Sequence, residues 1–274
     1  MCPLRITFPS ILCRAVVFAA AGFLGACGPR PIELPSGPST VLADPGEPFV
    51  AATDGCGDLR TLTAEMGLSG RAGGQRVRGT LLAGLARGGR LRLEALAPFG
   101  QPVFILVARD DRATLLLTRD ERVVSDVGTA AVLDAIAGLR FSGDDLLAIV
   151  TACAPVGVAP VSARRFAGGW TAITLEDDTV MYVRDSEAGP VVTAVERAGV
   201  TVEYEGRSGR LPGRVRLQTA GAAGQPGAAL ELSLQQVETN VELGPEVFEV
   251  RVPERAVPMT IEELRRTGLL GPGT

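Results

Sequence analysis

Residues 90–117 read RLRLEALAPFGQPVFILVARDDRATLLL, and this stretch decides the fold. In its first part Leu91 and Leu93, followed by two alanines, alternate with arginine and glutamate, which is the period-two pattern of a strand with one buried face. Residues 103–108 are apolar at every position, which indicates a strand buried on both faces. The stretch therefore predicts two strands joined by a loop around Phe99.

The loop carries the first candidate functional residue, Phe99. Pro98 and Pro102 cannot donate a hydrogen bond to a sheet, and Gly100 frees the backbone, so the chain turns here. Two interpretations of Phe99 follow. Either its ring folds back and plugs the core, or it projects from the loop as an exposed apolar contact residue.

Upstream, residues 75–86 form another strand candidate, joined to the first by a Gly-Gly hairpin signal at residues 87–89. Before it, residues 54–66 are predicted to form a short helix lying across one face of the sheet. The apolar residues at helical spacing in this segment are Leu59, Leu62 and Met66.

Downstream, a turn at residues 110–111 leads into a further strand, and then the hydrophobic period changes. Thr129 is predicted to cap a helix, and residues 142–145 resemble a capping box before a second helix. Two short amphipathic helices in a β pattern suggest a lid over one face of the sheet. The alternative is that they complete an ordinary packed core.

From Arg164 the β pattern returns, with turn residues between short segments. Such segments predict an antiparallel meander rather than βαβ units. Thr260 with Glu263 forms a capping box and Gly268 suits the position after a helix, which predicts a short C-terminal helix. The predicted fold class is mainly β, with a few short helices. The strands predicted in this half are residues 170–176, 179–184, 191–197, 200–205, 214–219 and 229–237.

The N-terminus has the pattern of a secretory signal. A basic flank, an apolar run at residues 15–23 and small residues precede Cys27, so residues 1–26 are predicted to be a signal peptide. The LGAC ending resembles the bacterial lipobox, which implies that Cys27 is acylated and anchors the chain to a membrane. A transmembrane anchor is the alternative, but it needs ~18–20 apolar residues and this run is shorter.

Beyond the signal, two further parts are predicted. Residues 27–50 are rich in proline without apolar periodicity, which favours a stiff tether; packing of a segment on the domain is the alternative. Residues 51–274 have the size of one domain with a substantial core. Gly28 follows the lipidated cysteine, and by analogy with the proteobacterial sorting rule this residue points to the outer membrane, facing the periplasm.

Composition argues against several classes of function. The chain has no histidine, which excludes histidine triads, histidine metal sites and histidine acid–base catalysis. Acidic pairs at residues 110–111, 144–145 and 177–178 stand at predicted turns or helix starts, where acids occur without catalysis. The formal charge is −4 and there is no basic block, so nucleic acid is not an expected partner. We therefore expect that the protein is not an enzyme and that it has neither a cofactor nor a metal site.

The five cysteines have different expected fates. Cys2 and Cys13 leave with the signal, and Cys27 carries lipid. Cys56 and Cys153 remain, and in an oxidising compartment such a pair favours a disulfide. A thiol nucleophile acting without histidine is the weaker alternative.

A strand, a Pro-apolar-Gly loop at residues 98–100 and an apolar strand, in a chain with a lipidation signal, resemble the LolB-type outer-membrane lipoprotein receptors and their LolA-type carrier relatives. The resemblance covers residues 67–153 best. It implies an open antiparallel half-barrel whose helices close an apolar cavity for acyl chains. It also implies that Phe99, the apolar residue of the loop, takes part in lipid transfer.

The function expected from these observations is that of an envelope lipoprotein that binds acyl chains and helps to sort or insert lipoproteins or lipids at the outer membrane. A periplasmic lipoprotein carrier is a candidate partner. The alternative is a noncatalytic structural lipoprotein that scaffolds an envelope complex. A carrier needs an apolar void of pocket size, whereas a scaffold fills it with side chains. The expected cavity-lining residues are Leu91, Leu93, Phe104, Leu106 and Leu115.

Overall fold

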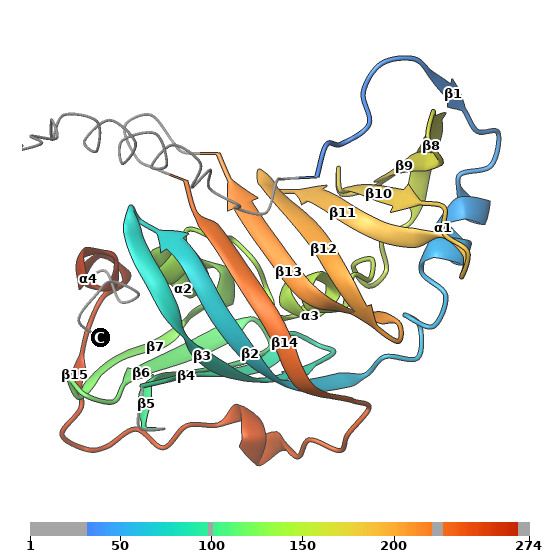
Figure 1. The fold of residues 1–274 in the computed structure, drawn as a ribbon. Coiled ribbons are helices and arrows are strands. Elements are labelled where there is room, and N and C mark those ends of the chain that lie inside the picture. The colour runs from blue at the N-terminus through green and yellow to red at the C-terminus, as the bar shows by residue number, and fades with distance from the viewer. Residues whose placement is uncertain (1–31, 98–100, 221–226, 268–274) are drawn as a thin grey trace, which may run out of the picture. The chain divides into compact units, whose positions relative to one another are not determined.

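The computed structural model describes residues 32–97, 101–220 and 227–267. The chain divides into two units, Met1–Ile32 and Glu33–Thr274, and every helix and strand described below belongs to the second. Within the described residues the strands form a single open sheet of fifteen strands. The predicted mainly β fold, with an open antiparallel sheet and short helices, is therefore confirmed (Figure 1).

The elements have the following bounds. The strands are β1 (Ser39–Val41), β2 (Thr61–Ala72), β3 (Gln75–Ala86), β4 (Arg90–Leu96), β5 (Pro102–Arg109), β6 (Arg112–Leu117), β7 (Arg122–Gly128), β8 (Pro160–Phe166), β9 (Trp170–Leu175), β10 (Val180–Arg184), β11 (Val191–Arg197), β12 (Val200–Ser208), β13 (Leu211–Thr219), β14 (Ala229–Thr239) and β15 (Val257–Pro258). The helices are α1 (Gly46–Ala52), α2 (Thr129–Ala137), α3 (Gly143–Thr151), the short 3-10 helix η1 (Pro245–Phe248) and α4 (Ile261–Thr267).

Two antiparallel meanders make up the sheet. Strands β2 to β7 follow one another as neighbours, and so do β8 to β14. The meanders join because β14 pairs with β2, which places Leu232 opposite Leu68. At the two ends of the sheet, β1 pairs with β8, and β15 runs parallel to β7.

The hairpin between β3 and β4 forms as predicted. Gly88 and Gly89 have φ angles of 82° and 67°, a left-handed conformation that glycine adopts without steric cost. The turn places Leu85 opposite Leu91 across the two strands. Both of these leucines are buried in the core.

The predicted helix over residues 54–66 is wrong, because β2 occupies the second part of this segment. Leu62, Ala64, Met66 and Leu68 are buried, while the residues between them are less so, which is the period of a strand. Leu62 and Met66 are four residues apart, and a strand and a helix both place such residues on one face. Their spacing alone could not separate the two structures.

The predicted tether over residues 27–50 is too long. Its second half holds β1, where Thr40 lies opposite Arg165 of β8, and most of α1, which contacts β8 and β9. Neither element needs apolar periodicity, because a three-residue edge strand is held by backbone hydrogen bonds. Pro45 precedes α1 at a position where its missing N–H costs no helical hydrogen bond. The first part of the range, up to residue 31, lies outside the described residues.

Helices α2 and α3 cover one face of the sheet, which we call the inner face (Figure 1). The predicted capping box opens α3, since Ser142 and Asp145 each accept a hydrogen bond from the other's backbone N–H. The predicted cap Thr129 is corrected, because Gly128 is the N-cap of α2 and Thr129 is buried in its first turn. The capping box of α4 is confirmed by its hydrogen bonds, while Gly268 lies outside the described residues.

Candidate functional site

An apolar cavity of about 100 Å³ lies between the inner face of the sheet and the helices α2 and α3. All of the described side chains around it are apolar. The sheet contributes Met66, Leu68, Leu81, Leu85, Leu93, Phe104, Leu106, Leu217, Leu230 and Leu232; the helical region contributes Leu133, Ile136, Ala137, Leu139, Leu146, Ile149 and Val150. Such a lining supplies no hydrogen bond, charge or nucleophile, so it suits a hydrocarbon ligand.

The strand register explains why the lining is uniform. Met66 lies opposite Leu81, and Leu93 lies opposite Leu106, so the alternating apolar residues of neighbouring strands fall into rows on the inner face. The residues between them point to the other face of the sheet, where Leu82 is 38% exposed. The period-two pattern of the sequence thus becomes one continuous apolar surface.

The five residues expected to line a cavity lie close together in the sheet. Leu93, Phe104 and Leu106 are among the residues around the cavity. Leu91 and Leu115 are fully buried core residues that do not border it. Leu91 pairs with Leu85 and Ala108, and Leu115 pairs with Leu106 and Val124, so each lies one position away from a lining residue.

The cavity is small for a ligand site, because sites for small molecules usually measure ~300–1,000 Å³. Several of its lining residues are nevertheless only half-buried. These residues are Leu81, Leu93, Ile136, Leu146 and Leu232. The side chains of the sheet and of the helices therefore leave an apolar surface partly open to solvent, and a long ligand could be accommodated only if a helix moved.

The first turn of α3 is fixed to the sheet. Arg197 of β11 forms an ion pair with Asp145, with 2.7 Å between the nitrogen and oxygen atoms, and Asp144 accepts a hydrogen bond from the backbone N–H of Gly88. Gly143 also packs on Gly89 so closely that an added Cβ would lie 2.6 Å from the Gly89 carbonyl oxygen. This backbone contact requires glycine at residue 143.

The other end of α3 is held by a disulfide. Cys153 follows the helix and is joined to Cys56, which precedes β2, with 5.7 Å between the Cα atoms. This pair is the one expected from the cysteine count. Helix α3 is therefore attached at both ends, and it cannot leave the sheet without breaking these contacts.

Helix α2 is held mainly by packing, because Val132 and Leu133 are buried in the core and the helix contacts α4, β6 and β7. Its main polar link among the described residues is the Asp134 carboxylate, which accepts hydrogen bonds from Arg265 of α4 and from Arg140. Desolvation opposes ionisation of Asp134, but these two guanidinium groups outweigh it and lower the pKa of the carboxyl group. Both arginine side chains are exposed, so their two ion pairs with Asp134 contribute little to stability.

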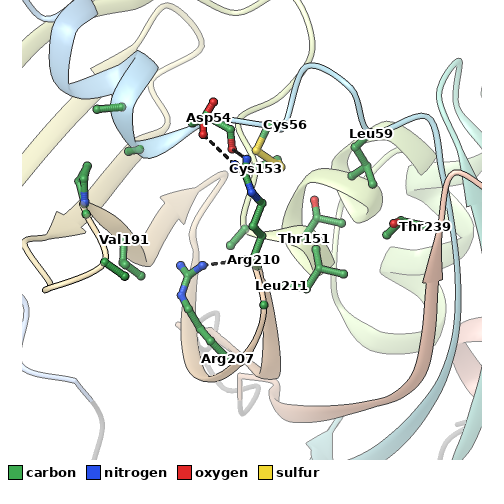
Figure 2. Close-up of a pocket in the computed structure, with 18 of the residues that line it drawn as sticks. Asp54, Cys56, Leu59, Thr151, Cys153, Val191, Arg207, Arg210, Leu211 and Thr239 are labelled. Carbon is green, nitrogen blue, oxygen red and sulfur yellow. Dashed lines mark hydrogen bonds and ion pairs between the residues drawn. A yellow bond between two sulfur atoms is a disulfide. The ribbon is translucent and has the colours of Figure 1, made fainter.

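A second hollow of about 580 Å³ lies at the C-terminal end of α3 (Figure 2). We call it the arginine pocket, because it is lined by Arg207, near the end of β12, and by Arg210, in the turn between β12 and β13. Sequence reasoning missed this pocket. Two arginines within four residues of a hairpin turn were a signal that could have drawn attention to it. Its other lining residues come from α1, the loop between α1 and β2, the disulfide, the C-terminal ends of α3 and β14, and the turn before β11 with the first residue of that strand.

Several negative findings concern the described residues alone. They contain no group of three or more acidic or cysteine side chains able to hold a metal ion. None of the helices in this part of the chain is long and apolar enough to cross a membrane. Cys27 and Phe99, which were assigned roles from the sequence, both lie outside the described residues.

Comparison with known proteins gives likenesses in structure alone. No family model matches the chain, and no curated protein matches it. A LolA superfamily protein from Nitrosomonas europaea is 9% identical, with a TM-score of 0.49, over 75% of this chain and 96% of that one. An outer membrane lipoprotein-sorting protein domain from Vibrio parahaemolyticus is 12% identical, with a TM-score of 0.45, over 69% of this chain and 89% of that one. A DUF1329 family protein from Desulfovibrio piger is 12% identical, with a TM-score of 0.46, over 76% of this chain and 98% of that one. All three TM-scores are below 0.5, so these likenesses assign neither a family nor a function to this chain.

Proposed function

We propose that this protein is a noncatalytic lipoprotein of the cell envelope that binds acyl chains on the inner face of its sheet. The observation that carries the proposal is the cavity under α2 and α3, whose described lining is apolar throughout and partly open to solvent. Keeping leucines half-exposed costs stability, at about 25 cal/mol for each Å² of apolar surface left in water. An acyl chain would recover this free energy when it binds.

The size of the cavity requires a movement, and α2 is the element that we expect to move. Helix α3 is attached to Arg197, to the turn at Gly88 and to the disulfide, whereas α2 is held by noncovalent packing and by exposed ion pairs. Each methylene group that enters the site gains about 0.8 kcal/mol, so the many methylene groups of a long acyl chain would offset the loss of the α2 contacts. Leu133 and Ile136 of α2 would then contact the ligand instead of the sheet.

We further propose that the protein is exported, acylated on Cys27 and held at the outer membrane, facing the periplasm. Residues 1–26 would be the signal peptide. The tether would be shorter than predicted and would end before β1, because Ser39 already belongs to the sheet. In this position the protein would receive acyl chains of lipoproteins or lipids, with a periplasmic carrier as a candidate partner, and would help to sort or insert them.

A scaffold function is the second candidate, and one observation favours it. The void of about 100 Å³ is smaller than the ~300–1,000 Å³ of most ligand sites, as expected if side chains fill most of the inner face. A scaffold lipoprotein would keep α2 in place and carry no lipid. The two candidates therefore differ in whether acyl chains enter the cavity in cells.

Photocrosslinking with matched variants tests the proposal. Cells that express the full-length chain are given palmitate that carries a photoactivatable diazirine, and they are then irradiated. The labelled peptides are mapped by mass spectrometry. Label is expected on α2 and β3, apart from any label attached at Cys27. Leu81→Trp, which fills the cavity, should lower this labelling about tenfold, the effect of excluding two methylene groups. Leu82→Trp, on the opposite face of the same strand, should leave it unchanged. Equal labelling in both variants, or no label on cavity peptides, would refute acyl binding here.

Phe99 is proposed to meet lipid at the mouth of the cavity. If its ring projects from the loop, Phe99→Glu should change the free energy of unfolding by under ~0.5 kcal/mol, as at ordinary surface positions. The rate at which a fluorescent fatty acid passes from the protein to acceptor vesicles should fall sharply, while its binding persists. Phe104→Ala is the control for a buried ring in this region, and it should cost ~3–5 kcal/mol. If Phe99→Ala costs as much as Phe104→Ala in denaturation experiments, then Phe99 is part of the core.

A further inference from the structure

The arginine pocket carries an inference that is independent of the acyl cavity. Its volume of about 580 Å³ falls within the ~300–1,000 Å³ that is typical of small-molecule sites. The disulfide between Cys56 and Cys153 forms part of its wall, so this wall is covalently fixed (Figure 2). A fixed wall is favourable for binding, because less conformational freedom is lost when the ligand enters.

Arg207 is the unusual group in this pocket. Its guanidinium donates hydrogen bonds to two backbone carbonyl oxygens, that of Arg210 at 2.7 Å and that of Val192 at 3.2 Å. Among the described residues no carboxylate lies within ion-pair distance of it. Its neighbour Arg210 differs, since it pairs with the Asp54 carboxylate at 2.8 Å. The pocket therefore contains one positive charge that no described residue neutralises.

The backbone contacts orient Arg207 without using all of its donors. A guanidinium has five N–H donors in a planar fork that matches the geometry of carboxylate and phosphate groups. Desolvation lowers the pKa of Arg207, as expected for a cation without an acidic partner, but an arginine remains protonated in proteins. Arg207 is exposed to solvent at the pocket wall, so an oxyanion can reach its remaining N–H donors.

The rest of the pocket wall has both polar and apolar parts; its polar side chains are Asp54, Thr151, Thr239 and Asn240. Leu59, Val191 and Leu211 line it together with small residues of α1 (Figure 2). Helix α3 also connects it to the cavity, because Ile149 and Val150 border the cavity and the next residue, Thr151, borders the pocket. A cationic group beside the three apolar side chains suits a ligand with an anionic head and a short hydrocarbon portion.

We propose that the arginine pocket is a binding site for an oxyanion, a phosphate or carboxylate group, and that Arg207 is its main ligand. Leu59, Val191 and Leu211 form an apolar part of the wall that the hydrocarbon of an amphiphile would contact, whereas a free anion would contact Arg207 alone. The proposal rests on Arg207 and the pocket walls and does not require that acyl chains enter the cavity.

Native mass spectrometry of the full-length chain in a nonionic detergent tests this site. The chain is titrated with inorganic phosphate, with dioctanoyl phosphatidic acid and with uncharged dioctanoylglycerol. Arg207→Gln is expected to weaken binding of the phosphate-bearing probe about tenfold, because it removes a charge-assisted hydrogen bond. Arg78→Gln removes an exposed charge on β3, outside the pocket, and should leave binding unchanged. Dioctanoylglycerol should bind equally to both variants.

A second variant guards against a loss of folding in Arg207→Gln. Ala51→Glu adds a carboxylate at an exposed position of α1 on the pocket wall, where glutamate is compatible with a helix. It should weaken the same probe without changing the thermal midpoint. Binding of phosphatidic acid alone assigns the site to a lipid head group, and equal binding of inorganic phosphate assigns it to a free anion. If both pocket variants bind both phosphate probes as tightly as Arg78→Gln does, the proposal is wrong, whatever happens at the cavity.

Discussion

Replacing Cys56 and Cys153 together by serine is expected to lower the free energy of unfolding by about 4 kcal/mol, because the disulfide closes a loop of 97 residues. Closing a long loop removes conformations from the unfolded chain, and this is the main stabilising effect of such a bond. Chemical denaturation of the full-length protein and of the double variant measures the difference. Dithiothreitol should destabilise the wild type by a similar amount and have no effect on the double variant.

The same variant also tests how α3 is held. If the disulfide anchors the C-terminal end of this helix, its loss should increase hydrogen exchange in the last turn of α3 more than in the first turn, which Arg197 and Gly88 still hold. A change of less than about 1 kcal/mol, or two thiols that react with alkylating reagents in the native protein, would contradict this account.

Replacing Cys27 by serine is expected to abolish incorporation of labelled palmitate and to release the exported protein from membranes. Two or three acyl chains, at about 0.8 kcal/mol for each methylene group buried in the membrane, hold a protein durably. Without them, the proposed anchor buries no hydrocarbon in the membrane. Fractionation of cells followed by an alkaline wash measures the effect. Cys13→Ser is the matched control, because Cys13 lies within the proposed signal peptide and this change should preserve both labelling and membrane association.

Two results would contradict the prediction for Cys27→Ser in different ways. Label that persists in Cys27→Ser would show that another residue is acylated. An unlabelled variant that stays with the membrane after the wash would show that the chain is held by something other than lipid on Cys27. The described domain should keep its stability in either case, since β1 begins twelve residues after Cys27.

Local patterns correctly predicted most of the strands and the starts of α3 and α4. The alternation of residues 90–97, the Gly-Gly turn before it and the capping boxes at Ser142 and Thr260 are all set by neighbours in sequence. Such features depend on steric limits and hydrogen bonds within a few residues. They therefore appear in the structure where the sequence places them.

Predictions failed where a local pattern was ambiguous or too weak to detect. The spacing of Leu62 and Met66 fits a strand as well as a helix, and only pairing with β3 and β14 decides for the strand. Residues 39–52 lack a periodic signal, yet Thr40 pairs with Arg165 because the edge of β8 offers free backbone groups. In both cases the deciding partner is distant in sequence.

The sequence by itself determined that this chain builds an antiparallel sheet with an apolar face and short helices to cover it, because periodicity and capping are local properties. Only the tertiary structure decided which apolar residues border a void. Leu91 and Leu93 follow the same pattern, but Leu91 is packed in the core while Leu93 borders the cavity. The structure also brought Arg207 to Cys56 and Leu59 in one pocket. Proximity of this kind arises from strand pairing and helix packing over long sequence separations, which no local pattern records.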